Sequence, residues 1–234
     1  MSPIVMCLSG EVDLFAAFVI GAIGIDALRH VSRRRQLALA VIPLMFAFHQ
    51  LMDAGVWWSL TARLPELVGS VSAWLYLAIA LVIVPILVPL AVRSVEPNRQ
   101  RRRWMTPFIA LGVLVGIILG VVLVAGPVRA SIGGHFIDYR VGNTYSDPLG
   151  ALYIAAVAVP LLMSTDRRLV WLGGVNLVIV SGLAWLLVTG LVSLWCAAAA
   201  VQSVVIAHYL RTESGDPWKF PGRLRSLLAP MGAR

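Results

Sequence analysis

"LALAVIPLMFAFHQLMDAGVWWSL", residues 37–60, is the stretch that decides the fold. It is longer than the ~20 residues an α-helix needs to cross the hydrocarbon core of a bilayer. Asp53 is its only formally charged side chain, and His49 and Gln50 are its other strongly polar groups. The length and the apolar character predict a transmembrane helix, and the three polar residues call for a separate explanation.

Further apolar runs of similar length lie on both sides of this one. The chain has 234 residues, of which 59% are hydrophobic and only 13% are charged, about half the charged share of a soluble domain. Its mean hydropathy is +0.87. These values predict an all-α, polytopic membrane protein built as a bundle of seven transmembrane helices. The expected spans are 12–29, 37–60, 70–92, 104–126, 148–164, 169–188 and 191–210.

The basic residues alternate between the two ends of these spans. The chain carries 19 lysines and arginines and a net charge of +8, and most of them follow the first, third, fifth and seventh spans. Only Arg63, Arg129 and Arg140 fall in the other loops. Cytoplasmic loops are enriched in basic residues, so the pattern predicts an outside N-terminus and an inside C-terminus. We expect a multi-pass protein of the inner (plasma) membrane whose basic loops contact anionic lipid head groups, and no nucleic-acid partner.

One domain, residues 1–211, accounts for all seven spans in this interpretation, and residues 212–234 form a basic cytoplasmic tail. The loop between the fourth and fifth spans is the one sizeable external segment. It contains two β-prone runs around Gly133-Gly134, a pair typical of a tight hairpin turn. The sequence therefore predicts a short extracellular β-hairpin at about 127–147 that covers the outer end of the bundle.

Small residues and prolines predict how two of the spans pack. Gly112, Gly116 and Gly120 recur every four residues in the fourth span, a spacing that lets another helix approach closely. Pro85 and Pro89 lie in the third span, where a missing N–H bends a helix. We expect a kink in the third span.

The polar residues of the second span share one helix face. His49 and Asp53 are four residues apart, and Gln50 lies three residues before Asp53 and seven before Trp57. An ionised carboxylate inside a membrane is costly, so Asp53 should face the bundle interior, near its outer third. Candidate partners at similar depth are Glu11, Asp13, Asn176, Gln202 and Ser203.

Two interpretations of this polar stripe remain open. It is either a binding or proton-exchanging site that opens outward, with Asp53 as the candidate acid or base, or an interhelical hydrogen-bond network that fixes the bundle. No metal site is predicted, because the histidines lie at different depths and no metal-binding spacing is present. The cofactor is unknown. The two cysteines, Cys7 and Cys196, are expected to remain unbridged.

Two stretches resemble a family of uncharacterised bacterial integral membrane proteins that begin Met-Cys-Phe-Ser-Ala, the DUF6629-like family of unknown function. They are "MCLSGEVDLFAAFVIGAIGIDALRHV", residues 6–31, and "PLMFAFHQLMDAGVWW", residues 43–58. Met6, Cys7, Ser9, Gln50 and Trp57 match the family pattern. Leu8 and Gly10 depart from it, His49 stands where the family usually has Gln, and Asp53 stands where it has Glu. The resemblance implies a seven-helix membrane protein and no known activity.

The resemblance also leaves two translation starts open, Met1 and Met6. A start at Met6 followed by removal of the methionine would expose Cys7 as an N-terminal thiol and amine. That terminus would lie close to Glu11 and Asp53 at the outer mouth of the bundle. Cys7 is equally well explained as a small residue with no further role.

The candidate binding residues are Asp53, Gln50, His49, Trp57, Glu11, Cys7 and Gln202. We expect small-molecule or proton-coupled binding or transport at an outward-facing polar site. A membrane-embedded enzyme that acts on a lipophilic substrate, with Asp53 as acid or base, is the alternative, so enzymatic activity is left undecided. A structural or accessory subunit is the third class. The expected ligand is a small molecule or a lipid.

Overall fold

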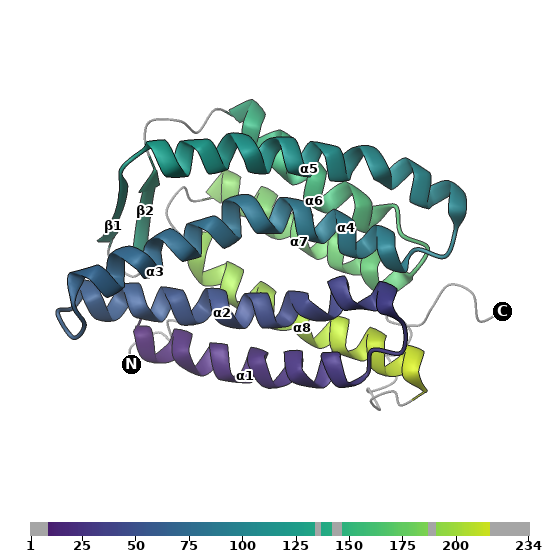
Figure 1. Cartoon of the computed structure of the whole chain (residues 1–234), viewed down its shortest axis with the longest axis horizontal. Coiled ribbons are helices and arrows are strands. Elements are labelled where there is room, and N and C mark those ends of the chain that lie inside the picture. The colour runs from purple at the N-terminus through teal and green to yellow at the C-terminus, as the bar shows by residue number, and fades with distance from the viewer. Residues whose placement is uncertain (1–8, 134–136, 142–146, 187–190, 216–234) are drawn as a thin grey trace.

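The computed structural model describes residues 9–133, 137–141, 147–186 and 191–215. The surroundings of the side chains of residue 147, 180–186 and 191–198 lie outside that description. Within it, the chain forms long helices that run side by side along one axis, with a two-stranded sheet at one end (Figure 1). The helices are α1 (Gly10–Arg29), α2 (Leu37–Leu60), α3 (Glu66–Ala78), α4 (Val84–Val95), α5 (Arg99–Ala125), α6 (Asp147–Leu162), α7 (Arg167–Leu186) and α8 (Leu191–Ser214).

Helices α3 and α4 are two parts of one continuous helix, Glu66–Val95, joined by a π-helical turn at Ile79–Ile83. Pro85 has no N–H to donate one turn back, and its ring clashes with the preceding turn, so the backbone widens just before it. The third predicted span therefore contains a π-helical turn shortly before its first proline, and the kink itself stays a prediction. Counted this way, the described residues contain seven helical rods, and each overlaps one of the seven predicted spans.

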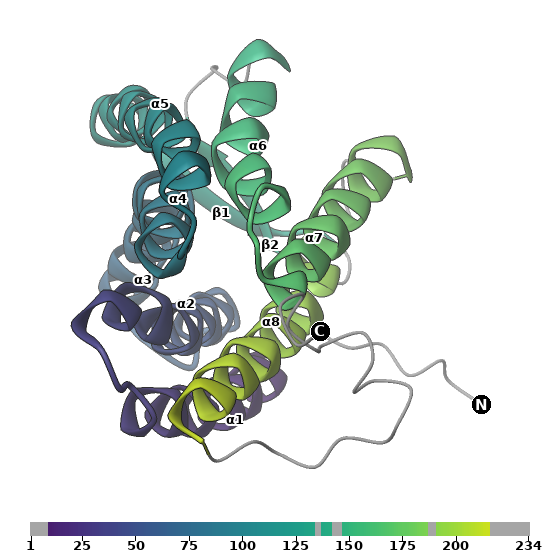
Figure 2. The same ribbon diagram turned by 90° about the vertical axis from the view of Figure 1, so that its right-hand side faces the viewer.

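The rods form a ring when viewed along the bundle axis (Figure 2). Consecutive rods pack against each other from α1 to α8, and α8 closes the ring by packing against α1 and α2. The largest apolar core lies in the half of the bundle away from the sheet and joins residues of α1, α2, α4, α6, α7 and α8, among them Ile20, Leu39, Val92 and Leu169.

Among the residues that the structure describes, three helices are long and apolar enough to cross a membrane: Arg34–Leu60, which adds a short 3-10 turn to α2, Glu66–Val95, and Arg99–Ala125. Residues Pro148–Leu162 form a shorter apolar helix. Large apolar side chains point away from the bundle, including Phe15 and Phe18 on α1, which are 71% and 70% exposed, and Val124 on α5, which is 76% exposed. Such a surface suits contact with lipid rather than water.

Gly112 on α5 lets the backbone of this helix pack closely against α4. A Cβ atom at Gly112 would stand 1.9 Å from the Pro85 carbonyl oxygen. That carbonyl has no helical N–H partner because residue 89 is also a proline. Glycine lets the α5 backbone approach this carbonyl, which explains why the close contact lies here.

The predicted hairpin is present as β1 (Val128–Ile132) and β2 (Ile137–Val141), which pair antiparallel with Ala130 opposite Tyr139. Side chains alternate between the two faces of a strand, so Ile137, Tyr139 and Val141 share the face that packs on the bundle. The apolar residues on this face join clusters with Trp57 and Tyr76. The hairpin thus covers the end of the bundle where α2 ends and α3 begins (Figure 1).

Candidate functional site

The polar stripe of α2 points into the bundle. His49, Gln50 and Asp53 are 3%, 1% and 1% exposed, although each lies on a helix that is long enough to cross a membrane. Their three- and four-residue spacing keeps them on one side of α2, toward α1 and α3, which are among its main packing partners. An Asp53 side chain that faced lipid would have excluded a binding site inside the bundle. The structure instead places Asp53 in the bundle interior.

Tyr139 on β2 donates a hydrogen bond to Asp53, with 2.5 Å between the phenol oxygen and carboxyl Oδ1. Burial raises the pKa of Tyr139 well above its ordinary value, and the neighbouring Asp53 raises it further. The phenol therefore keeps its proton and acts as the donor. This bond joins two residues that lie 86 positions apart and fixes the hairpin onto the bundle.

Asp13 on α1 is fully buried and shares a side-chain hydrogen bond with Asp53. A carboxylate can only accept hydrogen bonds, so a bond between two carboxyl groups needs a proton on one of them. Asp13 and Asp53 are therefore placed where two carboxyl groups can share one proton, as closely spaced acids do elsewhere. We call Asp13, Asp53 and Tyr139 the acid cluster.

An aromatic stack lines one side of the acid cluster. The rings of His49 and Tyr76 lie 3.8 Å apart at 25°, and the rings of Tyr76 and Tyr139 lie 4.5 Å apart at 13°. The stack leads from the hairpin to the histidine on α2. These contacts hold the His49 ring in a fixed orientation on α2, four residues before Asp53.

Two buried nitrogen atoms beside this stack lack hydrogen-bond partners among the described residues. They are Nε2 of His49 and Nε2 of Gln50. Buried polar atoms are nearly always satisfied in folded proteins, and an exception points to a functional requirement or to a bound group. His49 and Gln50 therefore offer hydrogen-bonding capacity that the described part of the protein does not use.

The other predicted site residues lie elsewhere. Trp57 is 7% exposed and packs beneath the hairpin with Val56, Ala73 and Ile137. Glu11 forms an ion pair with Arg63, in which both side chains are more than half exposed. Gln202 donates to Asn176 at 3.0 Å, which links α8 to α7. Cys7 falls outside the described residues. The binding roles of all four remain predictions.

Sequence reasoning included Asp13 only as a candidate partner of Asp53, and it missed Tyr76 and Tyr139. The signal for Tyr139 was present in "HFIDYRV", residues 135–141, where a β-period of two places Ile137, Tyr139 and Val141 on one face. Tyr76 is the one tyrosine in an otherwise largely apolar span, so its position alone does not indicate a role in a polar site. No spacing along the sequence connects it to His49.

A second group of buried polar residues lies at the opposite end of the bundle. Glu96 is fully buried and accepts hydrogen bonds from the Thr165 amide and hydroxyl at 2.8 and 2.5 Å. Arg168 is also fully buried, 3.3 Å from Asp166 and with its guanidinium 5.2 Å from the centre of the Tyr209 ring. The Glu96 contacts connect the end of α4 with the loop between α6 and α7, and Arg168 connects α7 with α8.

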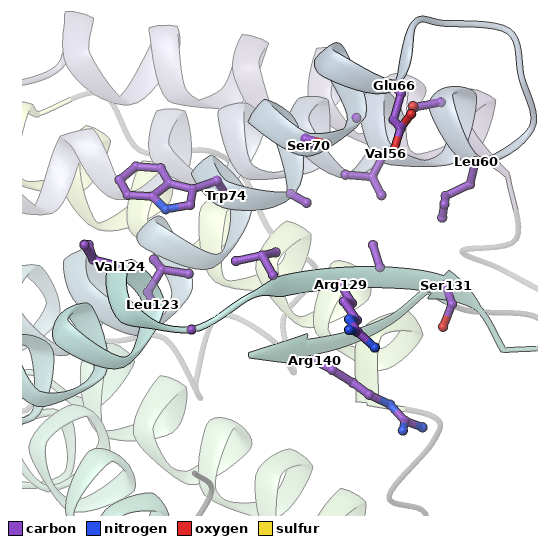
Figure 3. A pocket seen from close by; sticks show the side chains of 16 residues that line it. Val56, Leu60, Glu66, Ser70, Trp74, Leu123, Val124, Arg129, Ser131 and Arg140 are labelled. Atoms are coloured by element: carbon purple, nitrogen blue, oxygen red, sulfur yellow. The ribbon is translucent and has the colours of Figure 1, made fainter. Parts of the chain in front are cut away.

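A pocket lies next to the hairpin, outside the acid cluster. It has a volume of about 880 Å³ and runs between the first turns of α3, the end of α5 and strand β1 (Figure 3). We call it the hairpin pocket. Its lining residues are Val56, Ser59, Leu60, Glu66, Gly69, Ser70, Ala73, Trp74, Leu123, Val124, Gly126, Val128, Arg129, Ala130, Ser131 and Arg140.

Fold and site together define a class: a helical protein with membrane-spanning-type helices and a buried acidic and aromatic cluster covered by a β-hairpin. The chain belongs to the family of unknown function DUF6629, whose family model matches residues 6–219. This match confirms the resemblance seen in residues 6–31 and 43–58. Searches of curated proteins and of solved structures found no match.

Proposed function

We propose that this chain is a seven-helix integral membrane protein of the plasma membrane, with its N-terminus outside and its C-terminus inside. The ends of the helices that carry basic clusters support this orientation. Arg29, Arg93, Arg99 and Arg211 mark the ends of α1, α4, α5 and α8, and all these ends lie away from the hairpin (Figure 1). One bundle end is therefore basic, as a cytoplasmic face would be.

The function that we propose is proton-coupled binding and transport of a small polar molecule. The observation that carries this proposal is the acid cluster, in which buried Asp13 and Asp53 lie together and Tyr139 donates a hydrogen bond to Asp53 from the hairpin. We infer that the two acids share one proton. A buried carboxyl pair can exchange one proton when a ligand arrives, and His49 and Gln50 beside it have hydrogen-bonding atoms to offer that ligand.

Buried polar groups at three depths favour transport over catalysis at one site. The acid cluster lies in the outer half, the Asn176–Gln202 hydrogen bond lies about midway along α7 and α8, and Glu96 and Arg168 lie at the inner end. A transporter needs polar groups along its length, whereas an enzyme needs them only at its reacting centre. The inward orientation of Asp53 also gives no support to an accessory subunit with a polar lipid-facing surface.

The test compares Asp53→Asn with the wild-type protein, both purified in mild detergent from the same host. Asn keeps the shape of the side chain and removes its proton exchange. We expect a small molecule that co-purifies with the wild type, seen by native mass spectrometry, to be lost from Asp53→Asn. Asp138→Asn is the matched control, because Asp138 is on the outer face of the same hairpin and pairs with Arg140.

Proton coupling adds a second measurement to this comparison. The fraction of wild-type protein that carries the ligand should change with pH, since the ligand and a proton interact at the same carboxyl pair. Asp138→Asn should show the same pH dependence. The proposal fails if Asp53→Asn retains the same ligand at the same occupancy, or if occupancy is independent of pH between 5 and 8, roughly the range in which shifted carboxyl and imidazole groups titrate.

A further inference from the structure

The hairpin pocket combines one charged and one apolar surface. Arg129, Ser131 and Arg140 come from the hairpin, while Trp74, Leu123 and Val124 come from α3 and α5 (Figure 3). A ligand that fits both surfaces must be amphiphilic. None of the pocket's lining residues belongs to the acid cluster, so the two sites are separate.

The apolar surface of the pocket continues onto the outside of the bundle. Trp74 and Val124 line the pocket, yet they are 42% and 76% exposed. Val71 on the same helix as Trp74 is 50% exposed, and Val121, one turn before Val124, is 62% exposed. The exposed apolar surface between α3 and α5 would be covered by acyl chains in a bilayer, so a chain can pass from the pocket directly into the membrane.

Two arginines with like charges occupy neighbouring positions on the two strands of the hairpin. Arg129 and Arg140 lie directly opposite each other in the strand register, and like charges in that position repel. Arg140 has an ion pair with Asp138 at 2.8 Å, whereas no acidic partner of Arg129 is found among the described residues. Glu66 is the single carboxylate in the pocket lining, and no ion pair joins it to Arg129 among the described residues, so Arg129 is the arginine left to bind an anion.

Arg129 and Arg140 also lie at the bundle end that carries few of the chain's basic residues. Only Arg63, Arg129 and Arg140 lie in the loops on the hairpin side. Arg63 is explained by its ion pair with Glu11. Arg129 and Arg140 both line the hairpin pocket, so a ligand in that pocket could contact both.

We propose that the hairpin pocket binds one anionic phospholipid of the outer leaflet. Its phosphate lies against Arg129 and Arg140, its glycerol region lies against Ser131, and one acyl chain follows Trp74, Leu123 and Val124 toward the membrane. Arginine is well suited to phosphate because its planar group donates two parallel hydrogen bonds. Arg129, whose charge no acidic group balances among the described residues, supplies the positive charge for one phosphate.

The experiment measures lipid binding to the full-length protein by native mass spectrometry, with phosphatidylglycerol and phosphatidylcholine of identical chains as probes. We expect phosphatidylglycerol to bind about tenfold more tightly, and Arg129→Gln to remove this preference. Arg129→Lys should restore part of it by returning the charge. Arg63→Gln is the matched control, because Arg63 is an exposed arginine on the same side and does not line the pocket.

Two further arms separate a lipid from a soluble ligand. Phosphatidylglycerol with brominated chains should quench the fluorescence of wild type more than that of Trp74→Phe, because Trp74 would lie against the chain. Glycerol 3-phosphate should not displace the lipid at equal concentration. Without lipid, Arg129→Gln should unfold at the same or a slightly higher temperature, since the cross-strand repulsion is gone.

Three results would overturn the proposal. The first is equal binding of the two lipids to the wild type, and the second is an unchanged preference in Arg129→Gln. The third is displacement by glycerol 3-phosphate, which would identify the occupant as a soluble phosphate ester.

Discussion

At the scale of single residues, the site depends on a few hydrogen bonds among buried groups. Asp53 is held from two sides, by Asp13 on α1 and by Tyr139 on the hairpin. His49 contributes through its ring, stacked on Tyr76, and retains an unpartnered nitrogen among the described residues. This arrangement makes the carboxyl pair the chemical centre and the histidine an adjacent group.

Tyr139→Phe tests the bond between the hairpin and Asp53. Removing the hydroxyl leaves a buried carboxyl oxygen with one donor fewer, which should lower the free energy of unfolding by about 1–3 kcal/mol. Tyr153→Phe is the matched control, because Tyr153 donates at 2.8 Å to the uncharged carbonyl of Ala80. Thermal unfolding in detergent should show the larger loss for Tyr139→Phe, and an equal or smaller loss would mean that the bond to Asp53 is not made.

Alkaline pH tests the same phenol in the wild-type protein. The pKa of Tyr139 is raised in the folded state by burial, so the folded protein holds this proton more tightly than the unfolded chain does. Its contribution to stability is complete below the unfolded pKa of about 10 and is lost as pH rises toward the folded pKa. Unfolding temperatures should fall above about pH 10 more steeply for wild type than for Tyr139→Phe, and parallel curves would contradict this.

At the scale of elements, the helix pair α4 and α5 depends on one backbone approach. Gly112 meets the Pro85 carbonyl, whereas the nearest atom to a Cβ at Gly120, two turns further along α5, is 3.4 Å away. The regular spacing of the glycines thus conceals unequal roles. Proline and glycine act together here, because the prolines leave a carbonyl free and the glycine lets a neighbouring helix contact it.

Gly112→Ala should therefore destabilise the protein, while Gly120→Ala should change little. The added methyl at Gly112 would need the two helix backbones to separate, and overpacking of this kind costs about 1–3 kcal/mol or more. Unfolding in a series of denaturing detergent mixtures compares the two variants under the same conditions. Equal stability of both would show that α4 and α5 do not approach at Gly112.

The sequence predicted these elements unequally well. The bounds predicted for the second span, 37–60, are those of α2, because both of its ends coincide with the end of the apolar run. The third and fourth spans were expected to begin at 70 and 104, but α3 begins at Glu66 and α5 at Arg99. A helix continues through polar turns beyond the apolar segment, and hydropathy does not register those turns.

The site was predictable only as far as one helix reaches. The i, i+3 and i+4 spacing in α2 placed His49, Gln50 and Asp53 on one face. It could not show that the hairpin turns back over the bundle to bring Tyr139 to Asp53. Gln202, expected at similar depth, instead forms its hydrogen bond with Asn176, because depth along a bundle does not specify which neighbouring helix a side chain meets.

At the scale of the whole molecule, the ring of helices places the acid cluster and the hairpin pocket near one end and the basic loops at the other. The proposed orientation puts the hairpin outside the cell. Both proposals depend on it, because the acid cluster lies near the hairpin end of the bundle and the phospholipid belongs to the outer leaflet.

Single cysteines test this orientation in intact cells, with Cys7 and Cys196 replaced by serine. Ser131→Cys on the hairpin should react with a membrane-impermeant maleimide, because Ser131 is exposed. Gln100→Cys, exposed in the first turn of α5, should react only after the cells are broken. Labelling of Gln100→Cys in intact cells, with Ser131→Cys protected, would show the opposite orientation and would contradict both proposals.

The central claim is that Asp13 and Asp53 share a proton inside the bundle, and infrared spectroscopy of protein labelled with ¹³C-aspartate measures it most directly. The carbonyl stretch of a protonated aspartic acid should be present at neutral pH. We expect it to disappear when both acids are replaced, in Asp13→Asn/Asp53→Asn, because a single buried carboxyl left in place can keep the proton. It should persist in Asp138→Asn, whose carboxylate lies on the hairpin surface. Absence of the band from wild type, or its persistence in the double variant, would contradict the claim.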